Sequence, residues 1–371
     1  MTQAPGNAPD MLTRREWLIA GTVIACASRS VSTAVAQDNL SDTVVPIVCG
    51  QIGTTHAHAA GKLSAMLGQP QNWNVAGWSE PDPQRRSAVA DRKPYSEAPA
   101  MSEAELLAVP DLAAVAVETD FDQATQTALR AIQAGKHVHL DKPGGVDHVA
   151  FSQMRRAAEA AGLTVQMGYM LRYNPAFELL IQAVREGWLG EITEVDAAMG
   201  KLADPATRRQ LVLQPGGAMF EIGCHLIDIV VTLLGEPTHV ETFSTPSADD
   251  GVPDNQLAVL VYPRATANVR ANFTDPFGGP RRRFNVTGTQ GSFEIAPLES
   301  GVVQLSLTRA VGDFEQGRRT VRLDLVGGRY DGEFTDLARV IRGEKRLAWD
   351  AAHDIAVHAT TLRAAGIWNP L

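Results

Sequence analysis

The chain has 371 residues, of which 33 are Lys or Arg and 42 are Asp or Glu, so its formal net charge is -9. This length exceeds that of one typical hydrophobic core, and we therefore expect two domains. The acidic balance argues against a nucleic-acid partner and against binding to an anionic membrane surface.

Residues 1–36 are expected to be a twin-arginine signal peptide. Residues 13–18 read T-R-R-E-W-L, and a short apolar run follows as far as Ala27. A small-residue cleavage site ends at Ala36, which predicts a periplasmic protein with no membrane association after processing. The alternative is lipidation of Cys26, which would give a membrane-anchored lipoprotein.

Residues 37–168 predict a parallel sheet in the α/β class. Short apolar strands alternate with helices over short connections, a pattern that favours right-handed crossovers between parallel strands. The expected strands are 44–49, 75–78, 112–117, 138–140 and 163–166. Expected helices run to about residue 67 and over 102–109, 123–134 and 148–161.

Residues 169–371 predict a second α/β domain with a large, mainly antiparallel open sheet. Consecutive strands separated by Gly/Pro turns, without helices between them, favour antiparallel pairing. Expected strands are 192–199, 239–244, 256–262, 266–273, 283–288, 292–295, 302–308 and 320–325. Expected helices are 176–185, 219–234, 334–341 and 351–365.

A glycine turn after the first strand is the candidate dinucleotide site. The fingerprint G-x-G-x-x-G needs glycines that allow a tight turn and close approach of the backbone to a pyrophosphate. Gly50 and Gly53 fit the second and third glycines, whereas Val48 occupies the place of the first. A turn without a nucleotide remains open as an alternative. The candidate cofactor residues of this turn are Gly50, Gln51, Ile52 and Gly53.

An acidic residue, Glu80, ends the second predicted strand. A carboxylate at this point of a dinucleotide-binding domain takes the ribose hydroxyls and repels a 2′-phosphate. Arg85 and Arg86 follow closely and could reverse that preference. The choice between NAD and NADP therefore stays open.

The segment Gly135–Gly145 delivers Asp141, Lys142 and Pro143 to the C-terminal end of a short strand. Ligands of open α/β sheets bind outside the carboxyl ends of the strands, so we expect Lys142 to point into a cleft. The alternative is a surface lysine after a buried strand.

The helix after Gly217 carries a polar stripe on an otherwise apolar face. Glu221, His225 and Asp228 are spaced so that they share one side of a regular helix. A carboxylate one turn from an imidazole is a candidate acid/base pair if the stripe faces a cleft, and a solvated stripe if it does not. No third ligand has suggestive spacing, so we expect no metal site here.

Polar residues also cluster directly after the last strand of the first domain. Tyr169, Arg172 and Asn174 suit a ligand rich in hydroxyl groups. They would suit any domain junction equally well.

Together these motifs resemble the glucose–fructose oxidoreductase / inositol dehydrogenase / rhizopine-catabolism (Gfo/Idh/MocA) family. The segment A-G-K-H-V-H-L-D-K-P (134–143) is similar to the family's A-G-K-H-V-x-x-E-K-P. The segment 216–228 is similar to G-G-x-x-x-D-x-G-x-H-x-x-D, and G-T-Q-G-S-F-E (288–294) to a recurrent turn of the second domain. The resemblance covers nearly the whole chain after the signal peptide.

The resemblance implies a Rossmann domain that binds NAD or NADP, followed by a domain whose open sheet often forms homo-oligomer contacts. It assigns catalysis to Lys142 and His225, with Glu221 in the place of an aspartate that would orient the histidine or grip a hydroxyl. In a dry cleft near a cationic nicotinamide, the pKa of Lys142 is expected to fall. Asp141 replaces the motif glutamate and joins Lys142 in the cofactor set. The candidate substrate contacts are Tyr169, Arg172, Asn174 and Asp228.

Three functional hypotheses follow. The leading one is an exported oxidoreductase that transfers a hydride between a tightly bound nicotinamide cofactor and a sugar, polyol or sugar derivative. The second is redox-neutral glycoside cleavage or epimerisation through transient oxidation by bound NAD. The third is a non-catalytic sugar-binding protein on a decayed dehydrogenase scaffold. Val48 favours it, as does the sequence D-F-D-Q at 120–123, where the family commonly has a P-N-containing loop. The presence of both Lys142 and His225 argues against it.

Overall fold

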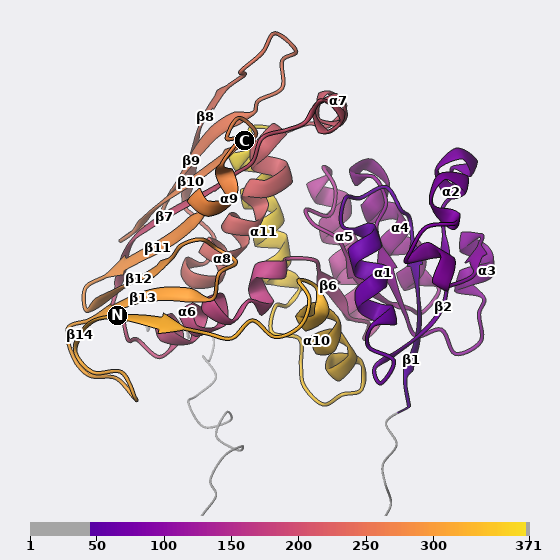
Figure 1. Ribbon diagram of the computed structural model, residues 1–371, viewed down its shortest axis with the longest axis horizontal. Coiled ribbons are helices and arrows are strands. Elements are labelled where there is room, and N and C mark those ends of the chain that lie inside the picture. Colours follow the sequence, from indigo (N-terminus) through magenta and orange to yellow (C-terminus); the bar gives the residue numbers. More distant parts are fainter. Residues whose placement is uncertain (1–44, 369–371) are drawn as a thin grey trace, which may run out of the picture. The chain divides into compact units, whose positions relative to one another are not determined.

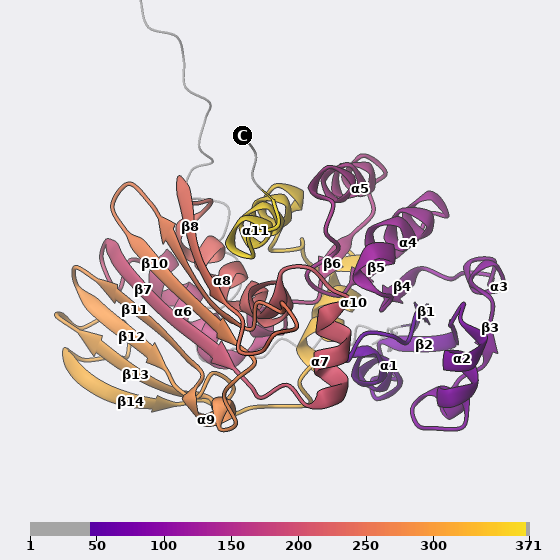
Figure 2. The same ribbon diagram turned by 90° about the horizontal axis from the view of Figure 1, so that it is seen from above.

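A computed structural model describes residues 45–368, which build two β-sheets with their covering helices (Figures 1 and 2). The expected signal peptide and Cys26 lie outside these residues. Within the described part of the chain, no helix is both long enough and apolar enough to cross a membrane.

The first sheet has six parallel strands in the order β3-β2-β1-β4-β5-β6, which is the order of a Rossmann domain. The prediction of a doubly wound parallel sheet is therefore confirmed. Its strands are β1 (Ile47–Ile52), β2 (Trp73–Ser79), β3 (Ala100–Met101), β4 (Ala114–Val117), β5 (His137–Leu140) and β6 (Val165–Met167). Its helices are α1 (Ala59–Leu67), α2 (Pro83–Ala90), α3 (Glu103–Leu107), α4 (Phe121–Gln133) and α5 (His148–Ala160).

The prediction of a turn at residues 50–53 is wrong for the first three of these residues, which lie in a strand. Gly50, Gln51 and Ile52 belong to β1 and pair with both β2 and β4. A Cβ on Gly50 would lie 2.6 Å from Leu106 Cδ1, so this glycine serves packing within the first domain. The turn begins at Gly53, whose φ of +91° disfavours any other residue.

The second sheet has eight strands in the order β14-β13-β12-β11-β7-β10-β9-β8, and only β7 and β10 pair in parallel. The predicted mainly antiparallel sheet is confirmed. Its strands are β7 (Ile192–Gly200), β8 (His239–Thr245), β9 (Asn255–Val261), β10 (Thr266–Asn272), β11 (Arg283–Gly288), β12 (Gly291–Ile295), β13 (Val302–Leu307) and β14 (Gly317–Arg322). Its helices are α6 (Pro175–Arg185), α7 (Pro205–Val212), α8 (Cys224–Leu234), α9 (Gly278–Arg281) and α11 (Ala351–Ala364).

Helix α10 (Asp331–Ile341) is late in the chain but packs on the first domain. Its buried face contributes Phe334 and Leu337 to a hydrophobic cluster with Leu63 and Trp73. The rings of Phe334 and Trp73 meet edge to face with centroids 6.0 Å apart. The first domain is thus completed by a segment that follows all eight strands of the second sheet.

The segment predicted as one helix over 219–234 is divided. A π-helical turn spans Met219–Gly223, and α8 follows from Cys224. Gly217 precedes the turn with a φ of +57°, and a Cβ there would lie 2.0 Å from the carbonyl oxygen of Pro253. Such wide turns inside helices are frequent at functional sites, and this one carries Glu221.

Candidate active site

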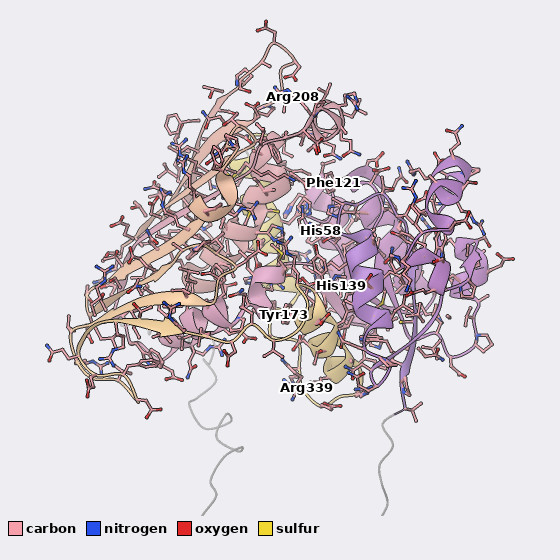
Figure 3. All side chains as sticks on the ribbon, in the orientation of Figure 1. His58, Phe121, His139, Tyr173, Arg208 and Arg339 are labelled. Atoms are coloured by element: carbon pink, nitrogen blue, oxygen red, sulfur yellow. The ribbon has the colours of Figure 1, made fainter. Side chains whose placement is uncertain are left out.

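A cleft of about 530 Å³ lies at the C-terminal ends of the parallel strands. Figure 3 shows His58 and Phe121 on the side of the first domain that faces the second. The cleft is lined from the first domain by the glycine-turn segment, Arg85 and the loop after β4, and from the second by Lys201, Glu221 and α7. Its lining residues include Thr55, His56, Thr119, Asp120, Phe121, Thr207, Gln210 and Gln214.

Lys142 follows β5 and is 1% exposed. Its Nζ donates to the carbonyl oxygen of Glu221 at 2.7 Å and to a carboxylate oxygen of the same residue at 3.2 Å. Burial lowers the pKa of Lys142, but the charges of Glu221, Cys224 and Asp141 outweigh it, and the pKa is raised. The expected fall in this pKa is therefore wrong for the protein in this state, because Glu221 pairs with the ammonium.

His225 lies in the first turn of α8 and is 3% exposed. Its Nδ1 has no hydrogen-bond partner within residues 45–368. Burial, reinforced by the charge of Lys142, places its pKa well below 6.5, so the ring is neutral near pH 7 and can accept a proton. The predicted pairing of Glu221 with His225 is not formed, because the Glu221 carboxylate turns to Lys142 instead.

The predicted substrate contacts Arg172 and Asp228 are instead a buried ion pair. The Arg172 guanidinium donates to both Asp228 oxygens, at 2.6 to 3.1 Å, and to Asp354 at 2.8 Å. All three side chains are inaccessible. The prediction that Arg172 and Asp228 contact the substrate is therefore wrong, because their opposite charges pair with each other inside the fold.

The other two predicted substrate contacts also have structural partners. Asn174 caps α6 by accepting from the backbone N–H of Ala176 at 3.0 Å. Tyr169 is 2% exposed, and its ring packs edge to face against the ring of His225, with the two centroids 6.0 Å apart. Tyr169 therefore packs against a predicted catalytic group, His225.

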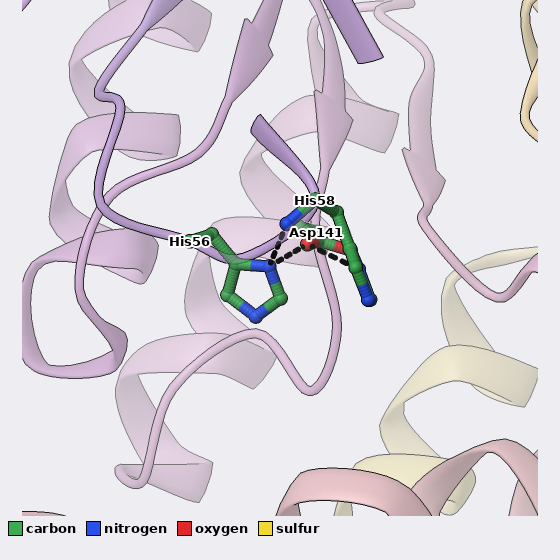
Figure 4. A group of neighbouring side chains, drawn as sticks. All are labelled: His56, His58 and Asp141. Carbon is green, nitrogen blue, oxygen red and sulfur yellow. Dashed lines mark hydrogen bonds and ion pairs between the residues drawn. The ribbon is translucent and has the colours of Figure 1, made fainter. Parts of the chain in front are cut away.

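Asp141 is held by the segment after the glycine turn. Its Oδ1 accepts from the backbone N–H of Lys142 at 2.9 Å, while its Oδ2 faces the Nδ1 atoms of His56 and His58 (Figure 4). Burial raises the pKa of Asp141, but the nearby histidines and Lys62 outweigh it and hold the pKa well below its usual range. Neither histidine was predicted from the sequence, where their only signal is the short H-x-H spacing before α1.

A buried charged cluster extends behind Asp141. Lys62 Nζ contacts His139 Nε2 at 3.0 Å and forms an ion pair with Glu333 of α10, and all three side chains are fully buried. Glu118, which directly follows β4, is also fully buried, and neither of its carboxyl oxygens has a partner among the described residues. Burial, followed by the charge of Asp141, raises the pKa of Glu118.

Glu80 follows β2 as predicted. Its carboxylate accepts from Thr54 N at 3.0 Å and Thr54 Oγ1 at 2.7 Å, and it pairs with Arg85 at 3.2 Å. A ribose hydroxyl would therefore have to replace one of these donors. Because Arg85 also lines the cleft, a carboxylate and a guanidinium stand side by side where the ribose of a dinucleotide is recognised.

The residues of the cleft fit a dinucleotide. Gly53 stands at the end of β1, where a Cβ would lie 2.7 Å from the backbone of Glu118. Thr119 Oγ1, on the loop that lines the cleft, is buried without a partner in the described chain. With the acid after β2 and the strand order, these features are typical of a dinucleotide-binding domain, here followed by a second domain.

Two family models match the chain. Residues 47–169 match "Oxidoreductase family, NAD-binding Rossmann fold", and residues 177–294 match "GFO/IDH/MocA C-terminal domain". The chain belongs to the Gfo/Idh/MocA family of NAD(P)-dependent oxidoreductases, as the sequence motifs predicted.

Relatives of the chain include further oxidoreductases. An uncharacterized oxidoreductase of Escherichia coli, YhhX, is 29% identical over 255 residues, covering 67% of this chain and 70% of the relative. A D-xylose 1-dehydrogenase (NADP(+)) of Haloferax volcanii is 28% identical over 253 residues, covering 67% and 75%. The structure of a levoglucosan dehydrogenase in complex with NADH and levoglucosan has a TM-score of 0.75 at 19% identity, covering 87% of this chain and 97% of that one, and shows the shared fold.

Proposed function

We propose that the protein oxidises a hydroxyl of a sugar, polyol or sugar derivative, or reduces the corresponding ketone, with a tightly bound nicotinamide cofactor. The observation that carries this proposal is the contact of Lys142 with Glu221, a residue that lines the cleft, with the neutral His225 one helical turn further along the chain. The sugar class is supported by the D-xylose and levoglucosan dehydrogenases among the similar proteins.

The bound cofactor supplies a hydride acceptor or donor. His225 has the protonation state of a general base, because its neutral ring can take the proton of a substrate hydroxyl. Lys142 carries its charge and can polarise the same oxygen. Glu221 holds Lys142 in place through two acceptors, and its own pKa is lowered because the charges of Lys142 and the nearby histidines outweigh burial.

The second-domain wall of the cleft suits a hydroxyl-rich ligand. Thr207, Gln210 and Gln214 line it together with Lys201, and these side chains offer hydrogen bonds without fixing one stereochemistry. Arg208 of α7 pairs with the buried carboxylate of Asp254 at 2.6 Å, which ties this wall to β9. We expect α7 to contribute to the choice of substrate.

Denaturing the purified protein and analysing the supernatant for a dinucleotide tests the proposal. We expect NAD or NADP to be released, and its identity settles the cofactor. The refolded or native protein is then offered a panel of aldoses, polyols and anhydrosugars while reduced nicotinamide is followed by absorbance. Absence of any released dinucleotide, together with no binding on titration, would overturn the proposal.

We further propose export through the twin-arginine route, with the cofactor acquired before translocation. The motif at residues 13–18 supports this, since that route carries folded proteins. Replacing Arg14 and Arg15 by lysine is expected to retain the protein in the cytoplasm, as measured by cell fractionation. Periplasmic recovery of that variant would contradict the proposal.

Assembly through the open sheet of the second domain is also proposed, on the basis of the family resemblance. Light scattering of the purified protein measures it. A strictly monomeric mass would contradict it.

A further inference from the structure

Three possible metal-ligand atoms converge beside the cleft. Asp141 Oδ2 lies 3.1 Å from His58 Nδ1 and is also in contact with His56 Nδ1, and the three ligand atoms all lie within 4.8 Å of one another (Figure 4). The side chains of His56 and Asp141 are 6% and 5% exposed. His56 lines the cleft, so the group borders the space available to ligands.

His56 Nδ1 has two neighbours. It is in contact with Asp141 Oδ2, and the backbone N–H of His58 points at it from 3.4 Å. The contact with Asp141 is a hydrogen bond when Nδ1 carries the proton. A metal ion bound to both groups would take the place of that proton, because histidine and carboxylate ligands bind metals in their deprotonated forms.

The charges behind the site point in the same direction. Three buried carboxyl groups, Glu118, Asp141 and Glu333, surround one buried ammonium, that of Lys62. Lys142 does not compensate them because it pairs with Glu221. The ammonium of Lys62 pairs with Glu333, so Asp141 has no lysine bonded to its carboxylate, and a cation bound there would be favourable.

Glu118 provides the independent observation. Its side chain is fully buried, and its oxygens have no hydrogen-bond partner within the described residues. Its backbone oxygen accepts from His56 N at 3.3 Å, so Glu118 is attached to the segment that carries the ligands. Burying an unpartnered carboxyl group is costly, and a cation bound beside it would offset part of that cost.

We propose that His56 Nδ1, His58 Nδ1 and Asp141 Oδ2 bind one divalent transition-metal ion of the Zn²⁺ class, with Glu118 as the neighbouring carboxylate. Two imidazoles and a carboxylate are the ligand types that Zn²⁺ and related ions take. Three protein ligands leave a fourth position for water or for a substrate oxygen, as in catalytic rather than structural zinc sites. This inference goes beyond the proposed dehydrogenase activity and does not depend on it.

The test uses the full chain stripped of metal with a chelator and then titrated with Co²⁺ or Zn²⁺. Bound Co²⁺ is followed by its visible absorption, and bound Zn²⁺ by elemental analysis after desalting. The variants are His58→Asn, the double variant His56→Asn/His58→Asn, and the control His239→Asn. His239 is a matched control because it also pairs with a carboxylate, that of Glu241, but is exposed on β8.

We expect one ion per chain in the wild type and in His239→Asn, and a tetrahedral-type Co²⁺ spectrum in both. The affinity for Co²⁺ and Zn²⁺ should fall at least ~10-fold in His58→Asn, and stoichiometric binding of either ion should be lost in the double variant. Circular dichroism checks folding, and if the double variant does not fold, the single variant decides. Less than one ion per wild-type chain, or equal affinity in His58→Asn and the wild type, would overturn the proposal.

Discussion

The Nζ atom of Lys142 lies 2.7 Å from the carbonyl oxygen of Glu221 and 3.2 Å from its carboxylate. This double contact joins the end of β5 in the Rossmann domain to the π-helical turn of the second domain. The turn makes it possible, because a wide turn exposes a backbone carbonyl that a regular helix would use internally. Glu221 therefore positions the lysine rather than the histidine.

Replacing Lys142 by Ala is expected to keep the bound nucleotide and to lower turnover by roughly 10²- to 10⁴-fold, since the ammonium that polarises the substrate oxygen is lost. Steady-state kinetics and the dinucleotide content of the purified variant measure the two effects. Lys93→Ala, at an 83% exposed side chain, is the control. Unchanged turnover would remove Lys142 from its role.

The pH dependence of kcat/KM should reflect His225. Its pKa lies well below 6.5, so the ring is deprotonated and able to act as a base at pH 6.5 and above. Activity should accordingly be lost only when the pH falls well below that value. The raised pKa of Lys142 keeps the ammonium charged on the alkaline side. An acid limb centred near 6.5 would show that His225 is solvated during turnover.

Removing the carboxylate of Asp228 should destabilise the fold by about 3 kcal/mol or more, because it leaves part of the buried Arg172 guanidinium unpaired. Urea unfolding of Asp228→Ala measures this. The control is Arg318→Ala, which breaks a pair with Glu294 whose side chains are 68% and 44% exposed, and it should cost less than about 1 kcal/mol. Equal effects of the two substitutions would contradict the structural assignment of Asp228.

Alanine substitutions at Gly53 and Gly135 distinguish the cost of steric crowding from the cost of backbone strain. Both have positive φ, +91° and +76°, but only at Gly53 would a Cβ meet other atoms. Alanine at Gly135 should cost about 1 kcal/mol through strain alone, and alanine at Gly53 should cost more and weaken nucleotide binding. Denaturant unfolding and nucleotide titration compare the two variants. Tight nucleotide binding by Gly53→Ala would place the pyrophosphate elsewhere.

Strong local patterns made the fold predictable. The apolar strand β4 and the capped helix α3, whose Ser102 and Glu105 form a capping box, are determined by neighbouring residues. Helices α2 and α7 were missed because their sequences lack an apolar face. The central place of β7, between β11 and β10, depends on pairing between distant segments and has no local signal.

The site was predictable where a motif fixes a residue at a strand end, as for Lys142 and Glu80. The site was not predictable where the local geometry of a helix decides the direction of a side chain. The prediction that Glu221, His225 and Asp228 share one face assumed a regular helix. The π-helical turn instead separates Glu221 from the face that carries His225 and Asp228. Arg172 and Asp228 are 56 residues apart, and only the folded chain shows that they neutralise each other.

Helix α10 has a consequence for dissecting the protein. A fragment ending after β6 would contain every strand of the first sheet and still lack Phe334 and Leu337, exposing the apolar surfaces of Leu63 and Trp73. It would also leave Lys62 without its partner Glu333. The nucleotide-binding half is therefore not separable by a single cut, and limited proteolysis between the sheets should release no stable N-terminal piece. The first domain should reach its native state only once α10 has been added to it.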